Sequence, residues 1–442
     1  MWLIGLAVFG LSQLEAQTFT NLYSFTGGSD GANPYAGLIL SSNTLYGTAV
    51  YGGTGMGTNG NGTIFKVNTD GSGFRVLTNF SAYAIANGSL PCPNASLVLS
   101  GHTLYGTTED GGSGGLGSVF KVNTDGSGFN DMHDFSGFDG FAPLGGLVLS
   151  NNILYGTTAL SYSGGATVFE INTNGGSLTT LTNNVGADPY ATLILSSNIL
   201  YGTTFHGGSS GWGTIFKVNT DGSGFTNLYN FYSYGPTRGS LVLSGNTLFG
   251  VTVGVGITGN FGSVFSINTD GSGFTNRYIF TNSANGSLPV AGLALSGNTL
   301  YGTTPAGGSE GYGTVFAVNT DGSGFTNLYS FKGGSDGANP YAGLVLFDNA
   351  LYGTTVNGGA QGYGTVFRIS ITNANVMIVT PQFSHGGSFQ FIVQGLSGQM
   401  YVIQTSTNLV NWRPIYTNSG SFIFSDTNVV YVPFRFYRAV KQ

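Results

Sequence analysis

Residues 292–331 read GLALSGNTLYGTTPAGGSEGYGTVFAVNTDGSGFTNLYSF, and versions of this stretch recur along most of the 442-residue chain. The register is clearest at a Leu-Tyr-Gly step, whose aromatic ring stands at Tyr46, Tyr105, Tyr155, Tyr201, Phe249, Tyr301 and Tyr352. These seven rings lie about 51 residues apart on average. A period of this size is typical of the four-stranded blade of a β-propeller, which has roughly 40–50 residues.

Each repeat contains four segments with strand patterning. The first, Gly-Leu-Val-Leu-Ser and its variants, carries no charge, as expected of a strand covered on both faces. The other three are the Leu-Tyr-Gly-Thr-Thr run, a segment such as Gly213–Asn219, and a segment such as Phe325–Phe331. We place the first strand innermost, because it begins with a small residue that fits near a crowded axis. These first residues are Gly37, Ser96, Gly146, Thr192, Ser240, Gly292 and Gly343.

Two repeated turns separate these strands. The turn after the first strand usually holds an Asn, such as Asn298, which tolerates the positive φ of a tight hairpin. The turn after the third strand reads Asn-Thr-Asp-Gly-Ser-Gly, with its acid at Asp70, Asp125, Asp221, Asp270 or Asp321. It is either a fragment of a calcium loop or a hairpin turn. Because each copy has one carboxylate and Ca²⁺ needs six to eight oxygens, we favour a turn in which Asp caps backbone N–H groups.

The ends of the repeat region indicate how its edges are closed. The last third strand, Gly364–Ser370, has no fourth strand after it, whereas an extra fourth strand, Phe19–Phe25, precedes the first repeat. We therefore expect these two segments to pair and to complete a seventh blade. The predicted fold is an all-β, seven-bladed β-propeller closed by the N-terminal strand, which removes exposed sheet edges.

The two ends of the chain predict further segments. Residues 1–16 include an apolar run too short to span a bilayer, and they are interpreted as a signal peptide. The propeller is then assigned to residues 17–372. Residues 373–442 depart from the repeat and predict about six short strands in a small β-sandwich, with Tyr401, Ile403 and Trp412 in its core.

The repeat LYGTT…GG…G.GTVFKVNTDGSGFTNLYSF resembles the GloVer-type tandem-repeat proteins of bacteria over residues 18–370. The resemblance implies an extracellular protein with propeller-like repeats and a C-terminal attachment or sorting region. The segment from Gly398 to Ala439 is similar to a β-sandwich tail of secreted bacterial proteins. No catalytic residue is implied by the family.

Composition limits the chemistry further. Only 7% of residues are charged and the net charge is −6, which argues against a nucleic-acid partner. The single Cys92 excludes an internal disulfide and is interpreted as a filler residue in a turn. None of the four His has a second His or Cys at ligand spacing, so no metal or cofactor is predicted. The adjacent acids Glu109 and Asp110 are interpreted as a solvated loop, and no catalytic residue is assigned.

The connections that carry sequence variation are those from the second to the third strand and from the fourth to the next first strand. They contain aromatic residues among small polar ones, a composition that suits the flat face of a sugar. The candidate ligand-binding residues are Trp212, Tyr312, Tyr363, Phe205 and His206. The alternative is that these rings are core residues covering the blade edges.

The sequence favours a secreted, non-catalytic binding or display module at the cell exterior, with an extracellular polysaccharide or cell-surface component as its partner. Two alternatives stay open. One is a carbohydrate-active enzyme, a glycosidase or lyase, that uses the variable loops. The other is a purely structural surface-layer component.

Overall fold

The computed structural model describes residues 18–54, 60–80, 92–183, 185–232, 238–254, 261–281, 283–371, 377–383, 389–394, 400–407, 410–420, 422–427 and 436–441. The segment interpreted as a signal peptide lies outside these residues. The chain divides into a repeat unit, Phe19–Ile369, and a second unit that includes Ser370–Gln442. In the described part of the chain, no helix is long and apolar enough to cross a membrane.

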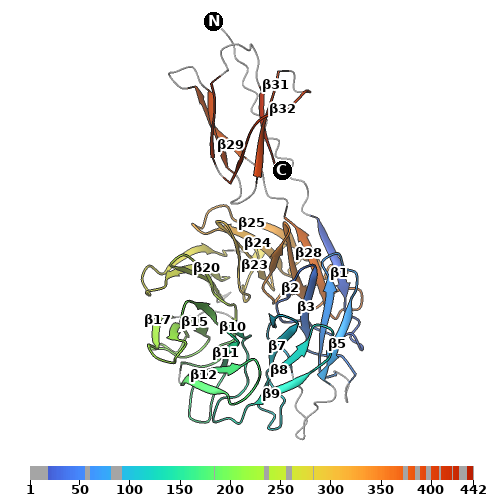
Figure 1. Ribbon diagram of the computed structural model, residues 1–442, viewed down its shortest axis with the longest axis vertical. Coiled ribbons are helices and arrows are strands. Elements are labelled where there is room, and N and C mark those ends of the chain that lie inside the picture. Colours follow the sequence, from blue (N-terminus) through green and yellow to red (C-terminus); the bar gives the residue numbers. More distant parts are fainter. Residues whose placement is uncertain are drawn as a thin grey trace. The chain divides into compact units, whose positions relative to one another are not determined.

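The repeat unit is built of seven antiparallel sheets of four strands each, within the described residues. In Figure 1 these sheets are arranged around a common centre. The first strands are β2 (Ile39–Ser41), β6 (Val98–Ser100), β10 (Val148–Ser150), β14 (Ile194–Ser196), β18 (Val242–Ser244), β22 (Ala294–Ser296) and β26 (Val345–Phe347). The second strands are β3 (Thr44–Ala49), β7 (Thr103–Thr108), β11 (Ile153–Thr158), β15 (Ile199–Thr204), β19 (Thr247–Thr252), β23 (Thr299–Thr304) and β27 (Ala350–Thr355).

The outer strands follow in the same order. The third strands are β4 (Thr63–Asn68), β8 (Ser118–Asn123), β12 (Thr167–Asn172), β16 (Thr214–Asn219), β20 (Ser263–Asn268), β24 (Thr314–Asn319) and β28 (Thr365–Ser370). The fourth strands are β5 (Arg75–Asn79), β9 (Asn130–Asp134), β13 (Thr179–Asn183), β17 (Thr226–Asn230), β21 (Thr275–Ile279), β25 (Thr326–Ser330) and β1 (Phe19–Ser24). A short 3-10 helix, η2 (Ser283–Asn285), lies in one connection.

The sheet that contains both ends of the repeat unit has the order β1-β28-β27-β26. β1 is antiparallel to β28, with Phe19 opposite Ile369 and Ser24 opposite Thr365. The predicted pairing of these two segments is therefore present. Buried residues of β1 and of the first and last sheets also form one hydrophobic cluster, which includes Leu22 and Phe25.

Aromatic rings pack neighbouring sheets together. A fully buried Phe stands in every third strand, at Phe65, Phe120, Phe169, Phe216, Phe265, Phe316 and Phe367. In most sheets it meets a Phe that follows the fourth strand of the preceding sheet. Phe331 and Phe367, for example, have ring centroids 5.2 Å apart at 66°. Phe25 and Phe65 make the same edge contact, at 5.1 Å, between the last sheet and the first. Such edge-to-face pairs are favourable beyond the area they bury.

The Leu-Tyr-Gly step packs directly on these rings. Its Tyr or Phe is buried in every repeat, which confirms the prediction that it is a packing residue. Its Gly lies over the third-strand Phe. A Cβ added at Gly302 would stand 2.5 Å from the Phe316 ring and 2.8 Å from Leu293. The glycine is therefore required by the close approach of a ring.

We expect Gly302→Ala to lower the free energy of unfolding by about 1–2 kcal/mol, because overpacking a core typically costs about 1–3 kcal/mol and the added Cβ restrains the unfolded chain. Gly334→Ala is the matched control, since nothing lies within 4 Å of an added Cβ there. Urea unfolding of both variants measures the difference. Equal stabilities would contradict the packing described here.

The turn after the first strand differs from the prediction in its detail. The positive φ falls on the residue before the Asn position in all seven repeats, at Ser42, Gly101, Asn151, Ser197, Gly245, Gly297 and Asp348. The Asn itself has a positive φ only at Asn152 and Asn349. A turn with positive φ at its first central residue alone is of type II′, which suits the twist of a hairpin as well as type I′ does.

The second unit contains six strands in two three-stranded sheets within its described residues. They are β29 (Met377–Phe383), β30 (Phe389–Gln394), β31 (Met400–Ser406), β32 (Arg413–Ser419), β33 (Phe422–Asp426) and β34 (Phe436–Lys441). Its core draws on both sheets, including Phe391, Ile403 and Phe424. Tyr401 and Ile403 are buried as predicted, whereas Trp412 is half-buried beneath the Arg438 guanidinium.

Candidate functional site

The loop face of the repeat unit is formed by the connections between second and third strands and those from each fourth strand to the next first strand. Four antiparallel strands in sequential order send both connections to the same end of the sheet. Backbone bridges join the two kinds, as between Ala32 and Tyr51 and between Ala338 and Asn357. Side chains also cross between sheets here, since the Asn339 amide donates to the carbonyl of Pro305 at 2.8 Å. The variable loops therefore form one layer.

Three predicted aromatic residues lie on this face in the same backbone frame. Trp212, Tyr312 and Tyr363 each form a parallel bridge, to Gly207, Gly307 and Gly358 respectively. Their exposed fractions are 42%, 44% and 44%. The Tyr363 ring lies against Gly27 and the Tyr312 ring against Gly333, where an added Cβ would stand 2.6 Å away. These tyrosines thus rest on a glycine of the next connection and keep much of their surface in solvent.

Phe205 and His206 belong to the same connection as Trp212, between β15 and β16, and they precede its bridge partner Gly207. Phe205 is half-buried and contacts the Tyr190 ring edge-on, with centroids 6.0 Å apart. His206 is exposed, and its Nδ1 lies 2.8 Å from Asp188 Oδ2. The Phe205 ring thus contacts Tyr190. Trp212, Tyr312 and Tyr363 stand in the connections of three different sheets.

The axial cavity has a volume of about 580 Å³ and is lined by all seven small residues of the predicted first strands, each of which stands two residues before the observed strand. Each lies beside the next: Gly37 by Ser96, Ser96 by Gly146, Gly146 by Thr192, Thr192 by Ser240, Ser240 by Gly292, Gly292 by Gly343, and Gly343 by Gly37. These residues are small because neighbouring sheets come close together at the axis, as predicted. A cavity of this size, lined by a few convergent polar groups, is typical of ligand sites.

The mouth of this cavity holds residues that the sequence analysis did not select. Every repeat places one residue there, two positions before its small residue: Tyr35, Asn94, Leu144, Tyr190, Arg238, Val290 and Tyr341. An alignment of the seven repeats would have identified this position, because its residue type varies strongly while the flanking residues are similar in most repeats. The Arg238 guanidinium lies 4.4 Å from the centroid of the Tyr190 ring. The rings of Tyr35 and Tyr341 lie 5.4 Å apart.

Two carboxylates line the same cavity, which corrects their interpretation as a solvated loop. Glu109 and Asp110 follow β7, and the Asn94 amide donates a hydrogen bond to Glu109. Burial raises the pKa of both carboxyl groups, and the Asp110 charge adds to the rise at Glu109 while Asn94 and Arg238 oppose it. Cys92 also lines the cavity, and burial beside the two acids raises the pKa of its thiol to about 12.

The Asp-containing turns lie at the opposite end of the sheets. In each of the five copies the Asp carboxylate accepts hydrogen bonds from the backbone N–H and hydroxyl of the Ser two residues on, as Asp70 does from Ser72 at 2.9 and 2.6 Å. These hydrogen bonds lower the pKa of the Asp70 carboxyl. The prediction that Asp caps backbone groups is confirmed. Among the described residues, no three His, Cys, Asp or Glu side chains gather as a metal site.

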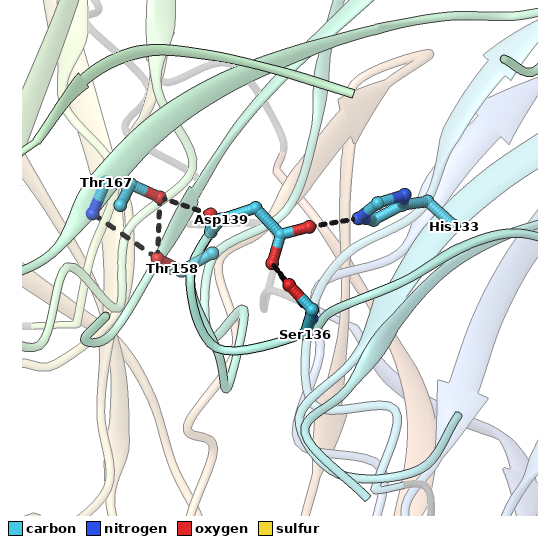
Figure 2. Close-up of polar contacts among 5 residues, drawn as sticks. All are labelled: His133, Ser136, Asp139, Thr158 and Thr167. Atoms are coloured by element: carbon cyan, nitrogen blue, oxygen red, sulfur yellow. Dashed lines mark hydrogen bonds and ion pairs between the residues drawn. The ribbon is translucent and has the colours of Figure 1, made fainter. Parts of the chain in front are cut away.

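A polar clamp holds the connection that leads from β9 to β10 (Figure 2). His133 Nε2 lies 2.7 Å from Asp139 Oδ2, and the Ser136 backbone and hydroxyl donate to Asp139 Oδ1. Tyr23 with Asp30, and Tyr329 with Asp336, occupy the same place in other repeats, each with the tyrosine hydroxyl 2.9 Å from the carboxylate. His133 therefore replaces a structural tyrosine.

The clamp predicts a pH-dependent contribution to stability. Burial raises the pKa of Asp139, but the hydrogen bonds from Ser136 and His133 outweigh it and lower the pKa below its ordinary value. A lowered folded-state pKa stabilises the fold above the ordinary aspartate pKa of about 3.9, and the contribution is lost as pH falls through the folded value. We expect Asp139→Asn to cost about 1 kcal/mol at pH 7 and less at pH 3, because the contribution of the carboxylate declines once the pH is below the ordinary aspartate pKa. Urea unfolding at both pH values measures this, with His133→Tyr as the variant that keeps the clamp.

The comparisons with known proteins support the same fold. A sequence model of the Gloeobacter/Verrucomicrobia repeat matches residues 7–184 and 233–411. Among curated proteins, none matches the chain. The solved structures that it resembles include an ancestral GH74 enzyme, at 12% identity and a TM-score of 0.50, with 78% of this chain and 49% of that chain covered.

Two further structures are similar at lower scores. An oligogalacturonate lyase in complex with manganese is 10% identical, with a TM-score of 0.49 and 81% and 94% of the two chains covered. TolB from Acinetobacter baumannii is 17% identical, with a TM-score of 0.38 and 60% and 58% covered. At such identities the likeness to the GH74 enzyme concerns the propeller-like fold alone.

Proposed function

Because the chain belongs to the Gloeobacter/Verrucomicrobia repeat family, whose repeats form sheets of four antiparallel strands here, we propose that residues 17–372 are a closed seven-bladed β-propeller acting as a non-catalytic binding module. The β1–β28 pairing and the mutual contacts of the seven small axial residues support closure. Residues 373–442 form a separate β-sandwich domain in this proposal. Its two-sheet core supports independent folding.

The proposed ligand is a neutral extracellular polysaccharide bound at the loop face. The observation that carries this proposal is the set of three half-exposed rings, Trp212, Tyr312 and Tyr363. The backbone of each residue forms a bridge, and the Tyr312 and Tyr363 rings also rest against a glycine. Rings held in this way present flat apolar surface at little cost in side-chain entropy, and sugar rings stack on such surfaces. Three platforms on different sheets would bind one polymer with avidity, even where each contact is weak.

A pull-down with insoluble cellulose, chitin, xylan and β-glucan tests the proposed function. We expect at least one of these polymers to retain the protein, and added salt to change the retained fraction little because the contacts are uncharged. Release of reducing ends from the same polymer would instead support the carbohydrate-active enzyme. Failure of every polymer to retain the folded protein would favour the structural surface-layer component.

The proposed location is the cell exterior, with residues 1–16 removed as a signal peptide. The apolar run near the N-terminus and the charge-poor composition support this proposal. N-terminal sequencing of protein from the native host is expected to read from Gln17. An intact Met1 on most molecules would contradict secretion by this route.

A further inference from the structure

The residues at the mouth of the axial cavity differ from repeat to repeat, although packing of the sheets does not require them to differ. Its seven small residues are needed because neighbouring sheets meet there; an added Cβ at Gly146, for example, would lie 2.6 Å from Thr192 Oγ1. The seven mouth residues are under no such limit. They comprise three tyrosines, one Asn, one Arg and two apolar residues. If these side chains served only to fill the mouth by packing, apolar residues at all seven positions would be sufficient.

Hydrogen-bonding groups of both kinds line this cavity. Glu109 and Asp110 supply acceptors that are partly removed from water, while Arg238 and Asn94 supply donors. Arg238 is held over Tyr190, and its charge acts on Glu109 and on Tyr35. A desolvated carboxylate gains from a ligand that donates hydrogen bonds to it, because such bonds replace those lost to water.

A negative charge on the ligand is disfavoured. An anion attracted by Arg238 would meet the two carboxylates of Glu109 and Asp110. A ligand with several hydroxyl groups satisfies both sets, since a hydroxyl donates to a carboxylate and accepts from a guanidinium. The Tyr35 and Tyr341 rings add aromatic surface for the apolar face of such a molecule.

We propose that the axial cavity is a second binding site, which takes a neutral mono- or disaccharide, including the end of a polysaccharide chain. The site is separate from Trp212, Tyr312 and Tyr363, and it rests on the proposed function only for the choice of carbohydrate as the ligand class. Its recognition is by hydrogen bonds within a cavity, whereas the exposed rings stack on the sides of a polymer.

Isothermal titration calorimetry with cellobiose, xylobiose and N,N′-diacetylchitobiose tests this site. We expect one of them to bind, and we expect galacturonic acid, which is anionic, to bind at least tenfold more weakly. Glu109→Gln/Arg238→Gln should weaken the binding at least tenfold, whereas Asp70→Asn, which removes a charge at the opposite end of the sheets, should leave it within about threefold. Arg238 is exposed, so Arg238→Gln alone serves if the double variant fails to fold.

Cys92 gives a second readout because it is the single cysteine and lines the cavity. The bound disaccharide should slow its modification by a maleimide severalfold in the wild type but not in the double variant. Trp212→Ala/Tyr312→Ala/Tyr363→Ala should keep both signals, even if it no longer binds a polymer, which separates failure of the two proposals. Absence of binding by all three neutral disaccharides, preference for galacturonic acid, or unchanged binding by the folded double variant would overturn the axial site.

Discussion

Deletion of residues 17–26 is expected to lower the free energy of unfolding by about 5 kcal/mol or more, which is comparable to the whole stability of many domains. The deletion removes β1, and with it Phe25 and Leu22 from the cluster between the last and first sheets. It also removes the Phe19 ring, stacked 4.3 Å from Tyr329. β28 would become an exposed edge strand, so we further expect aggregation.

Thermal unfolding and light scattering measure this effect, with deletion of residues 376–442 as the control. The control should leave the repeat unit folded, because the two units have separate cores. A synthetic peptide of residues 18–26 added to the truncated chain should restore part of the lost melting temperature by pairing with β28. Equal tolerance of the two deletions would contradict the closure of the unit by β1.

Trp212→Ala/Tyr312→Ala/Tyr363→Ala is expected to weaken polymer binding about 100-fold or more. Each ring contributes about 1 kcal/mol when it stacks, and about 1.4 kcal/mol corresponds to a factor of ten in affinity. Loss of all three platforms also removes the avidity between them. A depletion isotherm on the insoluble polymer that retains the wild type measures the dissociation constant.

The matched control is Tyr416→Ala, which removes a ring that is 40% exposed but belongs to the second unit. Its binding should equal that of the wild type. The triple variant must also melt within a few degrees of the wild type, because two of its rings cover glycines of neighbouring connections. A folded triple variant that binds as tightly as the wild type would assign these rings to packing.

The sequence predicted the strands of the repeat unit well because the signal is repeated. Seven copies of one register place the buried Phe, the Leu-Tyr-Gly step and the Asp turn with little ambiguity. The pairing of β1 with β28 followed from the leftover segments at the two ends. The position of the positive φ in the turn after the first strand could not be predicted from the sequence. Asn and most of the residues before it are of types that tolerate a positive φ.

The axial cavity was harder to predict because its mouth is assembled from all seven repeats. Tyr35, Tyr190 and Tyr341 are some 150 residues apart in the sequence, and each lies next to residues that look alike in every repeat. Glu109 and Asp110 looked like an ordinary polar loop, since adjacency in sequence says nothing about burial. Only the arrangement of the sheets brings these side chains to one cavity.

We propose that the loop face binds a neutral polysaccharide through its exposed rings. A crystal of the protein soaked with a hexasaccharide of the retained polymer would reveal where the sugar lies. We expect sugar rings stacked on Trp212, Tyr312 or Tyr363. Sugar bound only at the opposite end of the sheets, beside the Asp-containing turns, would contradict it.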